Sequence, residues 1–216
     1  MERTECQEFL PAAGNLLVTT RDSRVGGKHF RHRVEIREMS VDEATELLLT
    51  GAGLEEEEWN PETKGFAWAI AKKVGYLPLA IEQSASYIRE TGCNLAAYLE
   101  VFNEYRKSML NPSSDPRNSF SHDYPNTVAT TWMVSVRRVA QENPTAAKLL
   151  YLFAFLDPDS IPEPILLEGL KGLEQCLELQ EADRIKFDAA IRSLNSFSLI
   201  TRRSGDRSIQ LTCPLE

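Results

Sequence analysis

The turn from Gly75 to Ile81, between two helical patterns, constrains the fold of this chain most. Gly75 can end the preceding helix, because glycine takes the left-handed conformation at a helix C-terminus without steric cost. Pro78 fits the first turn of the following helix, where its missing N–H loses no hydrogen bond. The apolar residues then recur at helical spacings: Leu77, Ile81, Ala85 and Ile88. The segment is therefore a tight helix–turn–helix joint, which either lines a ligand pocket or packs only for stability.

The composition is that of a globular chain with an acidic balance. The chain has 216 residues, of which 42% are hydrophobic, and its formal net charge is -8 at pH 7. This length suits one large domain or two to three small ones. Because nucleic acids attract basic surfaces, the charge disfavours a nucleic-acid-binding surface over the whole chain.

The sequence predicts a cytoplasmic protein that does not enter a membrane. The first residues have no apolar core of signal-peptide length, and no window reaches about 18 apolar residues. No metal site is predicted, because the His and Cys residues lack metal-ligand spacing. These are His29, His32, His122, Cys6, Cys93, Cys176 and Cys213. Free thiols in a reducing compartment fit this pattern best.

Residues 1–39 have the pattern of α/β material. The run from Asn15 to Thr20 is typical of a strand buried on both faces of a parallel sheet. Arg21 follows where that strand should end, and ligands of open α/β sheets bind at such carboxyl ends. Residues 21–37 carry six Lys or Arg against two acids, as a phosphate-binding loop or a merely solvated loop would. A second short strand is expected over residues 33–36.

Residues 40–110 predict a compact bundle of four helices, each with its own start signal. The signals are the capping box Ser40–Glu43, then Asn60–Pro61, Leu77–Pro78 and Asn94. Gly51 and Gly92 mark the ends of the first and third helices. The acidic run from Glu55 to Glu58 is expected to be a solvated connection.

Residues 111–125 are polar and rich in Pro, Ser and Asn, which predicts a linker. Beyond it, residues 126–216 predict helices followed by a two-stranded ribbon, the order of a winged-helix domain. The expected helices cover 127–141, 144–156, 164–170 and 185–197, and Asn143–Pro144 is the start signal of the second. The expected ribbon pairs 198–202 with 208–212. Because 149–156 is apolar all round, we expect it at the centre of the core. Further expected core residues are Ala189, Leu194 and Phe197.

Winged helices often bind DNA, but the charge of this part of the chain disfavours DNA as a partner. Residues 120–216 carry 10 Lys or Arg against 13 Asp or Glu. A balance of -3 gives a phosphate backbone little to bind.

Three segments, taken in order, resemble a known module. Leu16 to Arg21 is similar to a sensor-1 strand, and Gly75 to Gln83 is similar to a Gly-x-Pro motif. Ser121 to Phe155, followed by Leu194 to Thr201, is similar to a fungal winged-helix subdomain. Together they resemble the C-terminal part of an NB-ARC module, the nucleotide switch of STAND-class signalling ATPases. The fungal NOD-like type, in which tetratricopeptide repeats commonly follow, is the most similar.

The resemblance implies a mainly α fold with four parts. A remnant of a P-loop α/β sheet would occupy residues 1–39, and a four-helix bundle like the first ARC subdomain would occupy 40–110. The linker at 111–125 would lead to a winged-helix domain like the second ARC subdomain at 126–216.

The resemblance also implies a binding site for ADP or ATP. Arg21 would sense the terminal phosphate with Thr20 nearby, and Pro78 would line the adenine and ribose side with Leu77 and Leu79 around it. In that family ADP locks the helical subdomains against the nucleotide domain, and ATP releases them to expose assembly surfaces. Protein partners or self-assembly are therefore implied.

The sequence lacks the family motifs that ATP hydrolysis requires. No Gly-x-x-x-x-Gly-Lys-Ser/Thr P-loop occurs, since Gly26-Gly27-Lys28 lacks the first glycine and the hydroxyl residue. An acidic Walker B strand before Leu16 and a His in the last wing strand are also missing. We therefore expect no ATP hydrolysis, and a truncated product or fragment of a longer protein. Two functions stay open: an ADP-binding regulatory fragment, or a protein-interaction module that no longer binds nucleotide.

Overall fold

The computed structural model describes residues 34, 39–110, 123–169, 184–203, 205 and 207–212. The chain separates into two compact units, residues 1–37 and 38–216. In the first unit only Val34 is described; it is exposed and lies in neither a helix nor a strand. The strand expected over 15–20 and the rest of the one over 33–36 lie outside the described residues.

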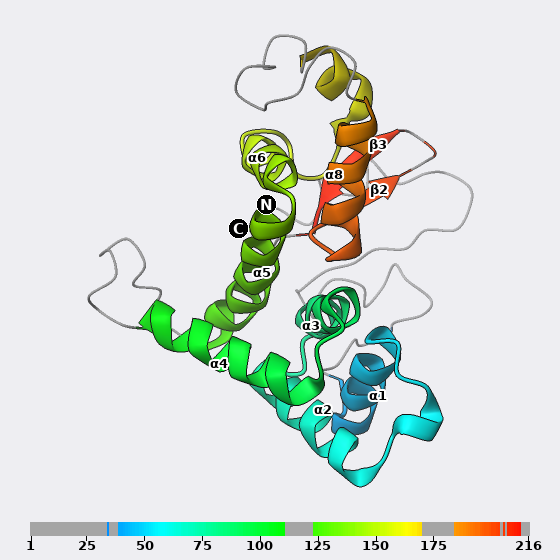
Figure 1. Ribbon diagram of the computed structural model, residues 1–216, viewed down its shortest axis with the longest axis vertical. Coiled ribbons are helices and arrows are strands. Elements are labelled where there is room, and N and C mark those ends of the chain that lie inside the picture. The colour runs from blue at the N-terminus through cyan, green and yellow to red at the C-terminus, as the bar shows by residue number, and fades with distance from the viewer. Residues whose placement is uncertain are drawn as a thin grey trace, which may run out of the picture. The chain divides into compact units, whose positions relative to one another are not determined.

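The second unit is mainly helical, as the sequence predicted (Figure 1). Its N-terminal helices are α1 (Val41–Gly51), the 3-10 turn η2 (Glu56–Glu58), α2 (Pro61–Lys73), α3 (Pro78–Thr91) and α4 (Leu95–Leu110). Its C-terminal elements are α5 (Asp123–Glu142), α6 (Pro144–Phe153), β1 (Ile161–Pro162), α8 (Arg184–Ser196), β2 (Ile200–Arg203) and β3 (Ser208–Leu211). Residues 163–169 are also helical.

The predicted helix starts are confirmed by their capping hydrogen bonds. Ser40 and Glu43 form the complete capping box at α1. The side chain of Asn60 accepts from the Thr63 N–H at 2.9 Å. The corresponding asparagines Asn94 and Asn143 cap α4 and α6 through Ala97 and Ala146. Local chemistry therefore fixes where these helices begin.

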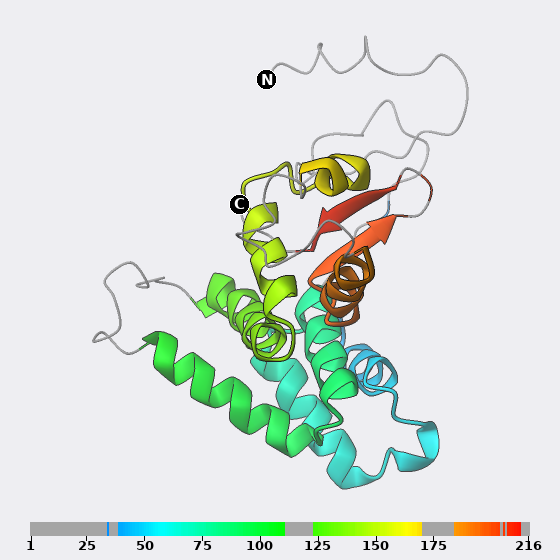
Figure 2. The same cartoon turned by 45° about the horizontal axis from the view of Figure 1, so that its top comes forward.

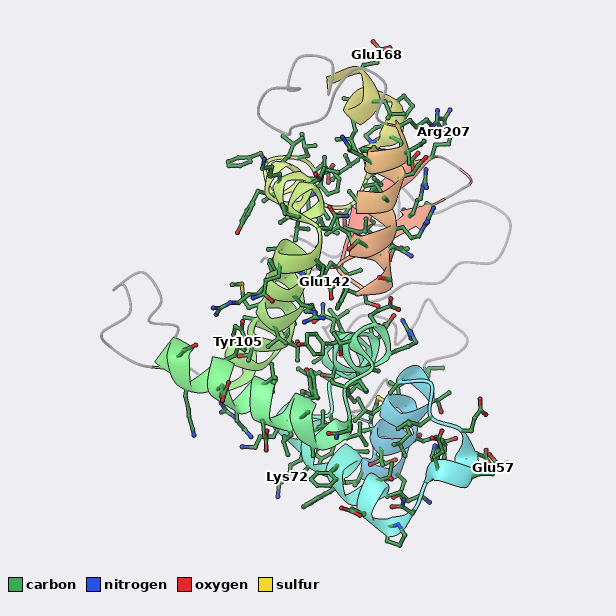
Figure 3. The ribbon with its side chains drawn as sticks, in the orientation of Figure 1. Glu57, Lys72, Tyr105, Glu142, Glu168 and Arg207 are labelled. Carbon is green, nitrogen blue, oxygen red and sulfur yellow. The ribbon has the colours of Figure 1, made fainter. Side chains whose placement is uncertain are left out.

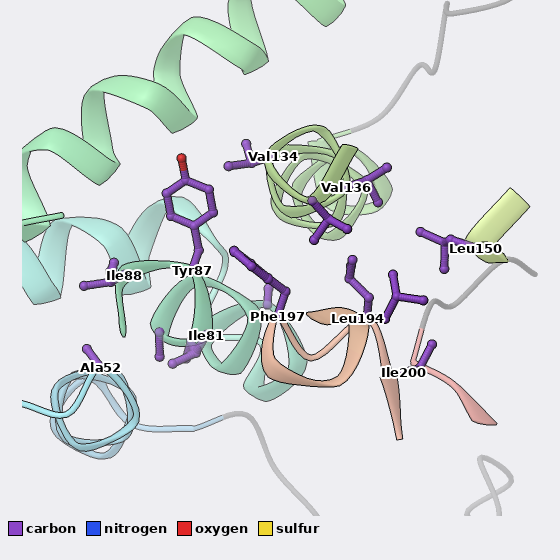
Figure 4. Close-up of a cluster of buried hydrophobic side chains, with 14 of the residues drawn as sticks. Ala52, Ile81, Tyr87, Ile88, Val134, Val136, Leu150, Leu194, Phe197 and Ile200 are labelled. Carbon is purple, nitrogen blue, oxygen red and sulfur yellow. The ribbon is translucent and has the colours of Figure 1, made fainter. Parts of the chain in front are cut away.

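Helix α3 lies at the centre of the described helices, in contact with α1, α4 and α5 (Figures 1 and 2). Ala80, Ile81 and every residue from Gln83 to Ile88 are buried. Figure 4 shows Ile81 and Ile88 facing Ala52, and Tyr87 on another side of the same helix, near Phe197. A helix buried on several sides joins the elements packed around it into one core.

The C-terminal elements form a small antiparallel sheet beside helices. The strand order is β1-β3-β2, with Ile161 opposite Ile209 and Ile200 opposite Leu211. The β2–β3 hairpin is confirmed, whereas the short strand β1 was not predicted. Two residues containing a proline give too little pattern for a strand, and only pairing with β3 defines it.

Helix α5 begins at Asp123, four residues before the predicted start at Thr127. Residues 123–125, predicted as linker, therefore belong to a helix. Pro125 did not end it, because a proline in the first turn sacrifices no intrahelical hydrogen bond. Residues 111–122 lie outside the described part of the chain.

Two core predictions were wrong. Helix α6 ends at Phe153 rather than continuing to residue 156, and Tyr151 and Phe155 are 66% and 88% exposed. Only one face of this apolar run is buried, through Leu149, Leu150 and Phe153. In α8 Ala189 is exposed, while its neighbour Ala190 is buried on the face that carries Phe187, Ile191 and Leu194.

Candidate functional site

The turn before α3 is built by a Schellman motif at the end of α2. The Gly75 N–H donates to Lys72 O at 3.2 Å, and the Tyr76 N–H donates to Ala71 O at 2.9 Å. Gly75 has φ 67, the left-handed conformation that the sequence predicted for it. Tyr76 is also left-handed, with φ 56, which is uncommon for a residue with a side chain. Two consecutive left-handed residues reverse the chain sharply into α3.

Helix α3 starts without a side-chain cap. Its N-cap residue, Leu77, is extended, as a residue before proline should be, and has no oxygen to offer. Pro78 at the first position has no N–H, so Leu79 and Ala80 present the first N–H groups. Pro78 is exposed, whereas Leu77 and Leu79 are partly buried. The N–H groups at this helix end carry partial positive charge, which favours an anion or another hydrogen-bond acceptor.

The structure describes three of the five predicted site residues. Leu77, Pro78 and Leu79 are consecutive on the start of α3. Thr20 and Arg21, the predicted phosphate contacts, lie outside the described residues. The geometry at α3 therefore covers only the side of the site that was assigned to the base and ribose.

Further along α3, buried polar side chains form hydrogen bonds with helices α4 and α5. Tyr98 of α4 donates its hydroxyl to Ser84 Oγ at 2.8 Å, and Ser84 donates to Ala80 O at 2.7 Å. Burial raises the pKa of Tyr98, so the hydroxyl stays protonated. Thr131 of α5 donates to Gln83 Oε1 at 2.9 Å. Among the described residues, the buried Gln83 Nε2 atom has no hydrogen-bond partner.

The C-terminal end of α3 is tied to two other helix ends by Arg89. Its guanidinium donates to Gly51 O of α1 at 2.7 Å and to Ser196 O of α8 at 3.4 Å. A cation is favoured at both places, because the carbonyls at a helix C-terminus carry partial negative charge. Nearby, Ser86 and Ser198 share a hydrogen bond of 2.8 Å. Helix α3 is thus linked to the first and last helices described.

An aromatic contact supports the same junction. The Tyr87 and Phe197 rings lie 6.1 Å apart at 66°, an edge-on arrangement, as Figure 4 shows. Tyr87 also lies 5.4 Å from the Tyr98 ring of α4. Burial is the main cause that raises the pKa of Tyr87.

A second polar centre lies on the sheet, around Arg202 of β2. Its guanidinium donates to Glu163 at 2.5 and 2.9 Å and to Asp188 of α8 at 3.3 Å. The Glu163 side chain is only 4% exposed, so the pair joins β2 to the segment after β1. The Glu163 carboxylate raises the pKa of the Arg202 guanidinium. This arrangement fixes the sheet against α8.

Sequence reasoning missed Gln83, Arg89 and Arg202. Each contacts at least one residue that is 38 or more positions away in sequence, and no local pattern predicts such pairs. One signal was available: three of the four residues 83–86 are polar (Gln83, Ser84 and Ser86), directly after the largely apolar start of the helix. Buried polar residues of this kind usually mark contacts between elements.

Metal and membrane sites are not evident in the described part of the chain. Among those residues, no three His, Cys, Asp or Glu side chains gather as metal ligands would. None of the helices in the described segments combines the length and apolarity of a membrane span.

Comparisons with known proteins found a family model and a distant relative. A family model described as a domain of unknown function (DUF7779) matches residues 138–212, from within α5 to the end of the sheet. The chain is 26% identical, over 94% of its length, to a nucleotide-binding leucine-rich repeat (NLR)-like protein of Hyaloscypha variabilis. It spans 20% of that protein's length. The chain is therefore similar, over nearly its whole length, to one part of an NLR-like protein.

Proposed function

We propose that this chain is a regulatory part of an NLR-type signalling switch, which binds ADP at the start of α3 and does not hydrolyse ATP. The observation that carries the proposal is the start of α3, with exposed Pro78, partly buried Leu77 and Leu79, and no side-chain cap. The name of the Hyaloscypha variabilis relative, a nucleotide-binding protein, supports it.

The adenine ring packs on Pro78 in this proposal, and the N–H groups at the start of α3 donate to the ligand. The family resemblance assigns the phosphate contacts to Thr20 and Arg21, which lie outside the described residues. Helices α1–α4 then correspond to the first ARC subdomain, and α5, α6, α8 and the sheet correspond to a winged-helix second subdomain. These residues contain no P-loop, so the phosphate cradle that phosphoryl transfer needs is not among them.

Thermal melting of the 216-residue chain with ADP tests this function. A ligand at about 100 times its Kd stabilises the folded state by about 2.7 kcal/mol, which raises Tm by several degrees. Pro78→Ala and Arg21→Ala should each abolish the rise. Pro61→Ala is the matched control, because Pro61 is also an exposed proline at the first position of a helix.

The proposal fails if millimolar ADP leaves the melting curve of the unmodified chain unchanged. It also fails if Pro61→Ala removes the rise as fully as Pro78→Ala, because the effect would then not be local to α3.

A protein-interaction module that does not bind nucleotide is the second candidate. The exposed side chains that favour it belong to the C-terminal elements: Tyr151, Phe155, Ile165 and Ile185. Large apolar side chains exposed in this way are suited to contact with another protein surface. If ADP leaves the melting curve unchanged, protein interaction replaces ADP binding as the function that we propose.

A further inference from the structure

The C-terminal elements carry a basic hollow that the proposed nucleotide site does not use. It is lined by Glu163, Arg184, Arg202, Arg203 and Arg207, and has a volume of about 490 Å³. We call it the arginine hollow. Figure 3 labels Arg207, which belongs to the β2–β3 hairpin. Helix α8 and both ends of the hairpin loop therefore contribute arginines to one concave surface.

The charge of the hollow is opposite to that of the chain. Arg202 is compensated by Glu163 and Asp188, and Asp188 also lies 3.7 Å from Arg184. Arg203 donates to Gln210 at 2.5 Å, and a neutral amide leaves its positive charge in place. The four arginines with Glu163 and Asp188 carry a formal charge of +2, in a chain of net charge -8. Gathering like charges costs free energy unless an anion binds among them.

Glu163 holds two of these arginines, Arg202 and Arg207, in place before any ligand binds. The Glu163 N–H donates to Arg207 O at 2.9 Å, while the Glu163 carboxylate holds Arg202. Arg207 has φ 52, a left-handed conformation that favours glycine or asparagine over arginine. The buried Glu163 carboxylate thus fixes the rim of the arginine hollow. Arg207 occupies a backbone position that does not favour arginine.

We propose that the arginine hollow binds a phosphate monoester. A phosphate monoester carries a charge of about -1.5 to -2 at pH 7, which matches the charge of the hollow. Arginine forks donate two parallel hydrogen bonds to phosphate oxygens, which lysine cannot do. A duplex nucleic acid fits less well, because residues 120–216 as a whole are acidic. The proposal is independent of nucleotide binding at α3.

NMR titration of the ¹⁵N-labelled 216-residue chain at constant ionic strength tests the site. The probes are phenyl phosphate, a phosphoserine peptide, the same peptide without phosphate, and a short DNA duplex. We expect saturable shifts of the Arg184, Arg203 and Arg207 signals with both phosphate monoesters. The unphosphorylated peptide should cause none. Comparing phenyl phosphate with the phosphopeptide shows whether the hollow prefers a small molecule or a modified protein.

Variants separate the site from general charge effects. The double variant R203Q/R207Q should weaken phenyl phosphate binding by about tenfold or more. The control K107Q/R137Q removes the same charge from α4 and α5, and should bind as the unmodified chain does. R203K keeps the charge but loses the fork, and should lie between the two. Equal melting temperatures of the variants would show that they remain folded.

Three results would overturn the proposal. Shifts that do not saturate, or that are equally reduced in K107Q/R137Q, would show only nonspecific attraction. Duplex DNA that shifts the same arginine signals when phenyl phosphate does not would mean a nucleic-acid surface instead.

Discussion

At the scale of single residues, buried polar side chains of α3 form hydrogen bonds with the neighbouring helices α4 and α5. Tyr98 keeps its hydroxyl proton in the core and donates it to Ser84. An ionised phenolate at this place would have to be desolvated, which is costly. Stability should therefore depend on Tyr98 at alkaline pH.

Tyr98→Phe should change the alkaline unfolding of the chain. The pKa of Tyr98 is raised in the folded state by burial, while an unfolded tyrosine has a pKa of about 10. Below about pH 10 the contribution of Tyr98 to the free energy of unfolding is fully present. Above about pH 10 it falls by about 1.4 kcal/mol per pH unit, because only the unfolded state releases the proton. Urea unfolding from pH 8 to 11 measures this slope, which should be shallower in the variant.

Tyr151→Phe is the control for this prediction, since Tyr151 is an exposed tyrosine on α6. Its pH dependence should follow that of the unmodified chain. Parallel curves for Tyr98→Phe and the unmodified chain would contradict the account of Tyr98.

At the scale of helices and strands, start and end signals determine the bundle. Gly92 ends α3 with φ 64, and a Cβ there would meet no atom within 4 Å. Gly65 lies within α2 and is equally open. The two glycines therefore differ in backbone conformation and not in available space.

Alanine at these two glycines should have opposite effects. Gly92→Ala should destabilise the chain by about 1 kcal/mol, because a left-handed residue with a Cβ is strained. Gly65→Ala should stabilise it by about 0.5–1 kcal/mol, because alanine is the better helix former. Chemical denaturation of both variants measures the difference. Changes of the same sign would contradict this explanation of the end of α3.

The elements that the sequence could predict are those with local chemistry. Asn60, Asn94 and Asn143 gave three helix starts, because capping depends on residues within one turn. The hairpin followed from alternation around a turn. The pairing of β1 with β3 could not be predicted, because it joins residues 161 and 209.

The candidate site was predictable only in part, for the same reason. Pro78 and its neighbours carry a local motif, and their turn has the predicted form at Gly75. The arginine hollow was not predicted, although residues 184–207 hold six Lys or Arg against two acids. Counting charges shows the excess, but only the fold brings α8 and the hairpin together. The burial of Ala190 instead of Ala189 likewise depends on how α8 turns against the core.

At the scale of the whole second unit, α3 connects the N-terminal helices to the C-terminal elements. Arg89 reaches the ends of α1 and α8, and Ser86 meets Ser198. These polar contacts lie beside the apolar core that α3 shares with both sets of elements. Substitutions in α3 should therefore affect both the N-terminal helices and the C-terminal elements.

Arg89→Met should loosen the ends of α1 and α8 together. The Arg89 side chain is 46% exposed, so we expect a loss of only about 1 kcal/mol, or about fivefold faster exchange. Hydrogen exchange of the amides near residues 51 and 196 measures it. Arg137→Met is the control, because Arg137 lies over the Tyr105 ring of α4 instead. Faster hydrogen exchange at only one of the two helix ends would contradict the account that Arg89 holds both.

Calorimetric titration of the 216-residue chain with ADP tests the central claim most directly. We predict saturable binding of one ADP per chain with a Kd on the order of micromolar, which Pro78→Ala weakens and Pro61→Ala does not. Such a result would place a nucleotide at the start of α3 without a P-loop in these residues. No heat of binding at millimolar ADP would contradict the claim, and the role of the chain would then lie in contacts with other proteins.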